Sequence, residues 1–248
     1  MGNNFEVSGK TNRKKSVLRI LKIVLIGLLA VIVLAVAGFL IWAEGYSRAD
    51  GTAKAILSEQ NIKQDGRETI LSPASPSDTA LIFYPGGKVE AIAYLPMLEK
   101  ITRESGITCI LVKMPLNLAV FDPKAADGVM KAHPEIKNWY IGGHSLGGAM
   151  ASDYASKNQG RIKGLILMGA YIYGDYPASK ALTVYGTFNS NLEKDIHYKE
   201  NIVVIQGGNH AQFGNYGKQK GDPDATITAE EQQNITVKAV ADFLGRVK

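Results

Sequence analysis

The sequence predicts a three-layer α/β fold, in which a mostly parallel β-sheet is covered by helices on both faces, preceded by one N-terminal transmembrane helix. Two observations predict the sheet. Stretches with strand-like and helix-like spacing alternate after about residue 80, and the strand-like stretches are almost continuously apolar. Such strands are typical of parallel sheets that are buried on both sides. The transmembrane helix is predicted from 21 consecutive uncharged residues, 23–43.

The expected elements alternate regularly along the chain. We expect strands at residues 80–84, 107–113, 139–141, 165–168, 181–185 and 201–206, and helices at residues 89–103, 123–132, 146–156 and 229–247. The last helix follows Thr228-Ala229-Glu230-Glu231, a capping box in which two side chains bond each other's backbone amides. In a parallel α/β sheet the active site lies at the carboxyl ends of the strands. The residues that follow each strand are therefore the first candidates for chemistry.

Composition and charge narrow the possible functions. The chain has 28 basic and 23 acidic residues. Six of the basic residues and one of the acidic residues lie within residues 1–22, so the rest of the chain carries 22 of each. The excess positive charge therefore belongs to the N-terminus, and no nucleic-acid partner is expected. The single cysteine, Cys109, lies in an apolar stretch, and no Cys/His spacing indicates a metal site. We expect neither a metal nor a cofactor.

The uncharged stretch predicts a membrane anchor. As a helix, residues 23–43 would be roughly 31 Å long, enough to cross the hydrocarbon core of a bilayer. Basic residues precede the stretch, so we expect residues 1–22 to form a cytoplasmic tail and the domain to lie outside the cytoplasm of a bacterial cell. The competing interpretation is a cleaved signal peptide, with Ala35-Val36-Ala37 as the cleavage site. We expect residues 44–65 to be a juxtamembrane linker and residues 66–248 to be the domain.

Ser145 is the expected nucleophile. It lies at the centre of Gly143-His144-Ser145-Leu146-Gly147, between an expected strand and an expected helix. This G-x-S-x-G pattern is typical of a sharp turn that holds a serine hydroxyl clear of the backbone. The flanking glycines are needed because the strand and the helix approach each other closely at such a turn.

A serine nucleophile also needs backbone amides that bind the negatively charged oxygen of the tetrahedral intermediate. One donor is expected to be the N–H of Leu146, the residue after the nucleophile. The second is expected from Gly86 and Gly87, which follow the strand at residues 80–84. Glycines at this place let the backbone approach a substrate closely. These three residues form the expected oxyanion hole.

His210 is the expected general base among four histidines. It lies in the loop after the last strand, where the base belongs in a fold with the chain order serine, acid, histidine. His144 is inside the nucleophile turn and is expected to support it. His133 and His197 lie in polar surroundings and are expected to be solvated.

The acid that orients the base is less well defined. The loop after the strand at residues 181–185 is the usual place, but it carries no carboxylate before Glu193 and Asp195. Asp175 follows the preceding strand and is the first candidate. Asn189 is a further alternative, because its amide could orient the imidazole without a charge.

Four stretches of the chain resemble a known family. They are Tyr84-Pro85-Gly86-Gly87-Lys88-Val89, residues 112–119, residues 142–150, and residues 207–213 with Tyr216-Gly217. Together they resemble the α/β-hydrolase family, in particular its compact bacterial group related to dienelactone hydrolases. The resemblance implies an α/β-hydrolase fold, a Ser145–His210 pair and hydrolysis of an ester or related acyl bond. It also implies an aspartate in a Tyr-Gly-x-x-Asp-Gly stretch, at a position that Asn189 occupies in this chain.

The sequence therefore predicts a membrane-anchored, carboxylesterase-like serine hydrolase with a small-molecule acyl substrate. Ser145 would form an acyl enzyme that water then releases. Two alternatives remain open. One is a transacylase, in which another hydroxyl replaces water. The other is a non-catalytic envelope binding protein that keeps the fold.

Overall fold

The computed structural model describes residues 5–189 and 191–246, with side chains described from residue 17 onward. The chain forms two compact units, residues 1–45 and residues 46–248. The first unit contains the helix α1 (Phe5–Glu44). Its segment Val17–Glu44 is long and apolar enough to cross a membrane. This finding is compatible with a single-pass anchor.

The second unit is built on an eight-stranded sheet with the order β1-β2-β4-β3-β5-β6-β7-β8. The first two strands pair antiparallel, and all strands from β3 onward run parallel. The bounds are β1 (Ile62–Asp65), β2 (Glu68–Leu71), β3 (Thr79–Tyr84), β4 (Thr108–Val112), β5 (Asn138–His144), β6 (Ile162–Met168), β7 (Ala181–Gly186) and β8 (Ile202–Ile205).

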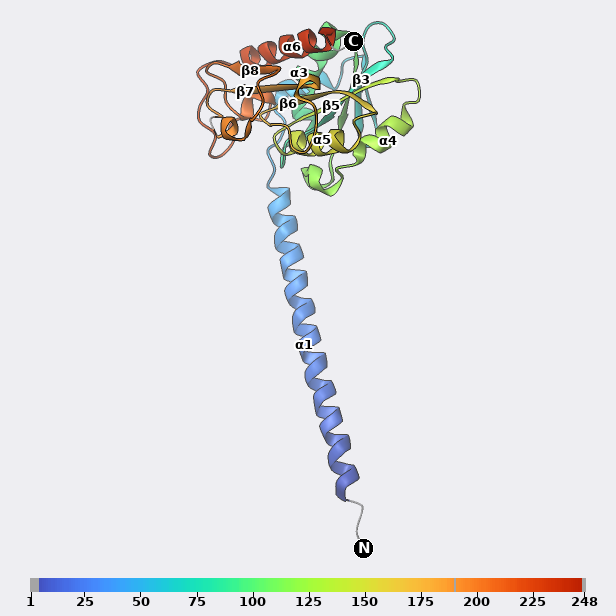
Figure 1. The fold of residues 1–248 in the computed structure, drawn as a ribbon. Helices are drawn as coiled ribbons and strands as arrows, with labels where there is room; N and C mark the ends of the chain where they lie inside the picture. The colour runs from blue at the N-terminus through green and yellow to red at the C-terminus, as the bar shows by residue number, and fades with distance from the viewer. Residues whose placement is uncertain (1–4, 190, 247–248) are drawn as a thin grey trace. The chain divides into compact units, whose positions relative to one another are not determined.

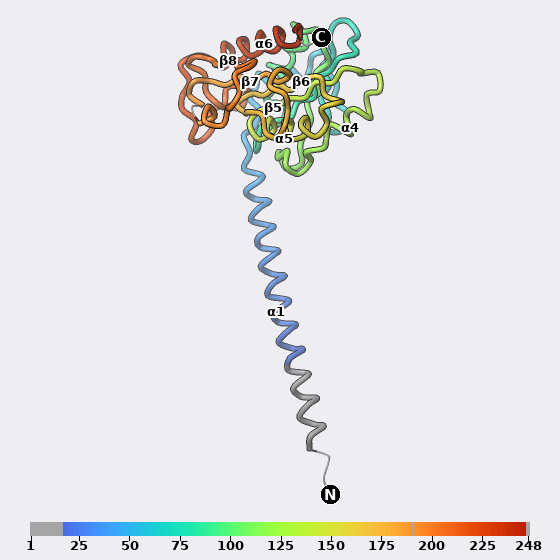
Figure 2. The backbone as a smooth tube through the Cα atoms, viewed as in Figure 1, coloured from blue at the N-terminus to red at the C-terminus, as the bar shows by residue number. Residues whose placement is uncertain are grey.

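Helices cover both faces of this sheet, as expected (Figure 1). One face carries α2 (Gly51–Ile56), α3 (Leu95–Ser105) and α6 (Ala229–Arg246), and the other carries α4 (Ala125–Ala132) and α5 (Leu146–Lys157). The backbone trace shows the same arrangement of α6 and α5 on opposite sides of the strands (Figure 2). Short 3-10 turns lie at Ala91–Tyr94, Pro115–Asn117, Ala119–Phe121, Ala178–Lys180, Leu192–Asp195 and Ala211–Phe213.

The apolar strands explain why both faces are covered. In β3, Leu81 and Phe83 pack into the core under α3 and α6, whereas Ile82 and Tyr84 pack into the core under α5. Successive side chains of a strand point to opposite faces, so a strand that is apolar throughout needs a helical layer on each side. The predicted three-layer α/β fold is confirmed.

The capping box of the last helix has the expected geometry. The N–H of Glu231 donates to Oγ1 of Thr228 over 3.1 Å, and the N–H of Thr228 donates to Oε2 of Glu231 over 2.8 Å. These bonds satisfy backbone amides at the start of α6 that have no partner within the helix.

The expected linker at residues 44–65 differs from the structure. The compact second unit begins at Tyr46, Ala53 of α2 is fully buried, and β1 forms the edge of the sheet. The sequence gives little indication of these two elements, because α2 has only six residues and β1 is mostly polar and exposed. The domain therefore includes most of the segment that was expected to be a linker.

Candidate active site

Ser145 lies in a strained turn between β5 and α5. Its backbone has φ 51° and ψ −121°, a conformation that side-chain-bearing residues rarely adopt. Its N–H donates to the carbonyl oxygen of Met168 on the neighbouring strand β6, which fixes the turn. The strain holds the serine between the end of the strand and the start of the helix, as the G-x-S-x-G pattern predicts.

The two flanking glycines are required by close backbone contacts. A Cβ on Gly143 would lie 2.6 Å from the carbonyl oxygen of Tyr84. A Cβ on Gly147 would overlap the carbonyl oxygens of Tyr84 and Pro85. Only glycine fits at either position, because the turn packs directly against the end of β3.

His210 lies in the loop after β8 and lines the same cavity as Ser145. This cavity has a volume of about 330 Å³, and Leu146, Asn189 and Asp195 also contribute to its wall. Within the described residues, no hydrogen bond joins the Ser145 hydroxyl to the His210 imidazole. Such bonds are often long or poorly aligned before substrate binds. The cavity nevertheless brings the expected nucleophile and base to one place.

Asn189 is the hydrogen-bond partner of the His210 ring. Its Nδ2 lies 2.9 Å from Nδ1 of His210. It follows β7, in the loop that is the usual place for the acid, and it is the alternative that the sequence offers there. Asp175, the first candidate, is exposed, and its recorded contact is a backbone carbonyl that accepts from Gln159. The choice of Asp175 is therefore corrected. The loop after β6 passes beside Ser156 of α5 at Gly174, whereas Asn189 in the loop after β7 reaches the imidazole.

The other two carboxylates do not bond the imidazole among the residues described. Oε1 of Glu193 accepts from the Tyr185 hydroxyl over 2.9 Å. Asp195 lies at the wall of the cavity and is exposed. Neither supplies the negative charge that a Ser-His-Asp triad places on the far side of its histidine.

The orientation of the Asn189 amide decides the tautomer of His210. If Nδ2 donates to Nδ1, the imidazole carries its proton on Nε2, which then cannot accept the serine proton. If the amide turns over and presents Oδ1, Nδ1 keeps the proton and Nε2 becomes the base. An asparagine can therefore support a competent base, but it does not enforce one as a carboxylate does.

Burial sets the protonation of His210. Its surroundings lower the pKa of the imidazole below the usual 6.5, mainly through loss of solvation, and the nearby Asp222 carboxylate opposes this effect. The ring is therefore neutral at pH 7, the form that can accept a proton.

The expected oxyanion hole needs one correction. The N–H of Gly86 donates to the Tyr94 hydroxyl over 3.1 Å, so it is already used and does not point at a substrate. In the described part of the chain, the N–H groups of Gly87 and Leu146 have no acceptor. A Cβ on Gly87 would lie 2.8 Å from Cδ2 of Leu146, so these two residues are neighbours. Gly87 and Leu146 are the remaining candidates.

A buried chain of hydrogen bonds connects the oxyanion loop to the loop of the base. The Tyr94 hydroxyl lies 2.8 Å from Nδ1 of His144, and Nε2 of His144 lies 3.0 Å from the carbonyl oxygen of His210. A carbonyl only accepts, so His144 carries its proton on Nε2 and accepts from Tyr94 at Nδ1. Burial, aided by the neighbouring His210, holds the pKa of His144 well below 6.5. His144 is a neutral link, in agreement with its expected supporting role.

Asp222 fixes the backbone of the base. Its two carboxylate oxygens accept from the N–H groups of His210, over 3.1 Å, and Ala211, over 2.7 Å. Sequence reasoning missed this residue and Tyr94. Asp222 follows Gly221 and precedes Pro223, which indicates a turn, but nothing in that pattern indicates that the turn folds back onto His210.

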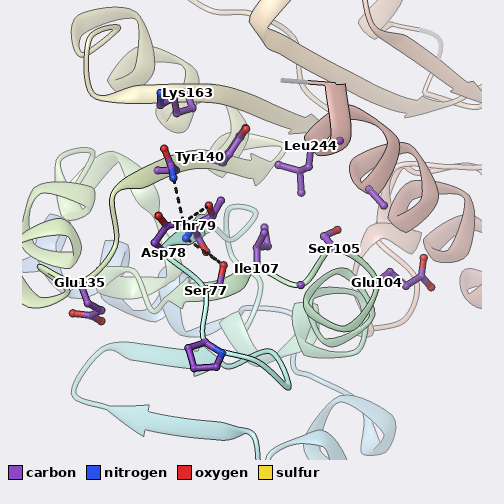
Figure 3. A pocket seen from close by; sticks show the side chains of 15 residues that line it. Ser77, Asp78, Thr79, Glu104, Ser105, Ile107, Glu135, Tyr140, Lys163 and Leu244 are labelled. Atoms are coloured by element: carbon purple, nitrogen blue, oxygen red, sulfur yellow. Dashed lines mark hydrogen bonds between the residues drawn. The ribbon is translucent and has the colours of Figure 1, made fainter. Parts of the chain in front are cut away.

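A second cavity lies at the opposite edge of the sheet, where β3, β4 and β5 begin (Figure 3). It is larger, at about 920 Å³, and polar residues such as Ser77, Asp78 and Lys163 line it. None of the described residues that line it is a histidine or a serine with positive φ. In parallel α/β sheets, chemistry occurs at the carboxyl ends of strands, so the smaller cavity at Ser145 is the candidate site.

A strained serine after a central parallel strand, with a histidine after the last strand, defines the class of α/β hydrolases. The sequence profile described as "Alpha/beta hydrolase family" matches residues 80–234, and the chain belongs to this family. No match is found among curated proteins.

The described residues contain no cluster of three or more His, Cys, Asp or Glu side chains that could hold a metal ion.

Solved structures show the same fold at low sequence identity. A suspected lipase from Acinetobacter baumannii AYE has a TM-score of 0.54 and 12% identity, covering 79% of this chain and 95% of its own. An esterase from Pyrobaculum calidifontis has a TM-score of 0.51 and 13% identity, and the match covers 79% of this chain and 89% of the esterase. A dienelactone hydrolase from Anabaena variabilis ATCC 29413 has a TM-score of 0.50 and 12% identity, and the match covers 72% of this chain and 90% of the hydrolase. These similarities establish the fold.

Proposed function

We propose that this chain is a membrane-anchored serine hydrolase that cleaves carboxylic esters, with Ser145 as nucleophile and His210 as general base. The observation that carries the proposal is the strained Ser145 turn, which lines one cavity with a neutral His210. Strain of this kind persists where function requires a fixed geometry. The esterases and lipases among the structurally similar proteins support the same reaction class.

The reaction would proceed in two steps. His210 Nε2 takes the proton as Ser145 Oγ attacks the ester carbonyl, and the amides of Leu146 and Gly87 hold the oxyanion. His210 then protonates the leaving alcohol, which departs and leaves an acyl enzyme. Water, deprotonated by the same nitrogen, releases the acid. Asn189 would position the ring during both steps.

Labelling with a fluorophosphonate probe tests the nucleophile. The detergent-solubilised full chain should be labelled, and both Ser145→Ala and His210→Ala should abolish the labelling. Ser156→Ala is the matched control, because Ser156 lies on α5, the helix that follows Ser145, and its hydroxyl donates to the backbone carbonyl of Asp153. Labelling that persists in Ser145→Ala would rule out the proposed nucleophile.

A binding protein that keeps the hydrolase fold is the second candidate. Asn189 favours it, because replacing the triad aspartate by asparagine costs about 10⁴-fold in kcat in a serine protease. The same probe separates the two functions. A chain that folds but takes up no label and cleaves no ester would favour the binding protein.

We also propose that residues 1–22 lie in the cytoplasm and that the hydrolase unit lies outside it. Six basic residues precede the apolar segment, and such clusters usually stay in the cytoplasm. Alkaline phosphatase, which is active only outside the cytoplasm, should be active when fused after Lys248. A cytoplasmic reporter that is active at the same position would overturn this topology.

A further inference from the structure

We infer that the edge of the domain that carries Ser145 docks on the bilayer through residues 115–121, and that its substrate is an amphiphilic ester taken from that bilayer. Residues 115–121, between β4 and α4, form the apolar loop. This inference rests on the proposed function, because it takes α1 as a membrane anchor and Ser145 as the nucleophile.

Most of the exposed apolar side chains of the second unit lie at the carboxyl ends of the parallel strands. In the described part of the second unit, seven large apolar side chains are exposed, and five of them follow the carboxyl end of a parallel strand. Three belong to the apolar loop after β4, and the others follow β6 and β7: Leu116, Val120, Phe121, Tyr173 and Phe188. Apolar residues that gather on one face mark a contact surface, whereas scattered ones do not.

The chain enters the domain beside the apolar loop. The N–H of Ser47 donates to the carbonyl of Lys88, and the N–H of Lys88 donates to the carbonyl of Asn117, each over 2.8 Å. The apolar segment of the anchor ends at residue 43, four residues before Ser47. Fully extended, four residue steps span roughly 14 Å at most. In an anchored chain, Ser47 and the adjacent apolar loop must therefore stay close to the bilayer surface.

The backbone of the apolar loop is strained. Leu116 and Asn117 have φ values of 52° and 54°, and both are residues with side chains. Asparagine tolerates this conformation, but leucine is disfavoured in it. The Leu116 side chain is 37% exposed, so the strain is not explained by burial in the core. A strained residue that presents an apolar side chain outward is expected where that side chain has a partner.

The charges around the apolar loop fit an anionic bilayer. Lys113 and Lys124 lie on either side of the loop in the sequence and are exposed. Neither makes an ion pair with a residue that the structure describes. The acid between them, Asp122, is paired with Arg67 over 2.7 Å. Lysines beside an apolar surface attract the headgroups of anionic lipids.

The apolar loop also reaches the candidate site. Cδ2 of Leu118 lies 3.6 Å from the position that a Cβ on Gly87 would take, next to the expected oxyanion hole. The Ser145 cavity, of about 330 Å³, is at the small end of the range for ligand sites. A cavity of this size holds the reacting ester but not a long acyl chain. The rest of an amphiphilic substrate can stay in the bilayer only if the cavity faces it.

A fluorescence experiment tests the docking without any need for catalysis. The full chain carrying Val120→Cys, labelled with an environment-sensitive maleimide, is placed in vesicles of phosphatidylethanolamine and phosphatidylglycerol. The native Cys109 is buried, and burial raises its pKa to about 12, so it reacts slowly. We expect a blue shift relative to detergent and quenching by spin-labelled lipid.

The matched control is Ile235→Cys on α6, where the native side chain is 43% exposed, against 46% for Val120. A label at position 235 should remain in water and should not be quenched. Equal quenching at both positions, or none at position 120, would overturn the docking surface, whatever the catalytic activity.

A kinetic comparison tests the source of the substrate. The double variant Leu116→Asn/Val120→Ser removes two apolar side chains, and asparagine suits the backbone at position 116. We measure the rate on 4-methylumbelliferyl palmitate in vesicles divided by the rate on soluble 4-methylumbelliferyl acetate. This ratio should fall about tenfold or more in the double variant and stay unchanged in Ile235→Ser. An unchanged ratio would overturn the bilayer as the source, and failure to hydrolyse either ester would instead count against the proposed function.

Discussion

The Tyr94 hydroxyl and Nδ1 of His144 lie 2.8 Å apart inside the core, and this bond joins the two loops that the proposed reaction needs. On one side, Tyr94 accepts from Gly86 beside the expected oxyanion hole. On the other, His144 donates to the backbone of His210. Both side chains are buried, so each polar atom in this series of hydrogen bonds has only its neighbour in the series, and not water, as a partner.

Replacing Tyr94 by phenylalanine should therefore destabilise the domain. The change leaves the Gly86 N–H and Nδ1 of His144 buried without partners, and each such group costs about 1–3 kcal/mol. We expect the free energy of unfolding to fall by at least about 2 kcal/mol. Urea unfolding followed by tryptophan fluorescence measures it.

Tyr216→Phe is the matched control for Tyr94→Phe. The Tyr216 hydroxyl donates to the side chain of Gln219 and takes no part in the buried chain. Its loss should cost less than half as much. Equal effects of the two variants would show that the Tyr94–His144 bond has no special weight.

Asn189→Asp should increase the esterase activity. A carboxylate at this position would accept from Nδ1–H, fix the tautomer with Nε2 free, and stabilise the imidazolium that forms. The gain in kcat should be large, up to about 10⁴-fold by analogy with the reverse change in a serine protease. Steady-state kinetics on a soluble ester measure it, with Asn189→Ala as the control that should lose activity. An aspartate variant no faster than the native chain would show that residue 189 does not control the base.

Gly169→Ala should displace the base. Gly169 has φ 53°, and a Cβ there would lie 2.9 Å from Nδ1 of His210 and 3.1 Å from its Cε1. Moving the ring by about 1 Å is expected to lower kcat roughly 100-fold. Gly160→Ala is the control, because a Cβ on Gly160 has nothing within 4 Å. Unchanged kcat in Gly169→Ala would place the reactive ring elsewhere.

The pH dependence should follow the neutral form of His210. The base works only when unprotonated, and burial lowers its pKa below 6.5. Activity should therefore be complete above that value and be lost as the pH falls through the lowered pKa. In Asn189→Asp the new negative charge raises the pKa, so the acid limb should move to higher pH. Profiles of kcat/KM for both proteins test the sign, and a native acid limb above pH 6.5 would contradict it.

Much of the fold could be predicted from the sequence because the signals were local. The apolar strands from residue 80 onward and the capping box at Thr228 each depend on a few adjacent residues. The short α2 and the edge strand β1 could not be predicted in the same way. Their few residues show no apolar periodicity, and only their packing against the rest of the domain makes them ordered.

The candidate site shows the same division. Ser145 and His210 could be assigned because a glycine pattern and a position after the last strand carry the information. The partner of His210 could not be assigned, because the choice between Asp175 and Asn189 depends on which loop folds over the ring. Tyr94 and Asp222 could not be found at all. Their roles come from hydrogen bonds between distant segments, which leave no pattern in the chain.

The amide at position 189 has a chemical consequence over the life of a sample. Asn189 precedes Ser190. When a small residue follows an asparagine, its backbone nitrogen can slowly attack the side-chain amide and expel ammonia, and water then opens the resulting ring to aspartate or isoaspartate. Ageing would thus convert part of a preparation into the aspartate form. Esterase activity that rises on storage, together with the small increase in intact mass that deamidation causes, would reveal this conversion.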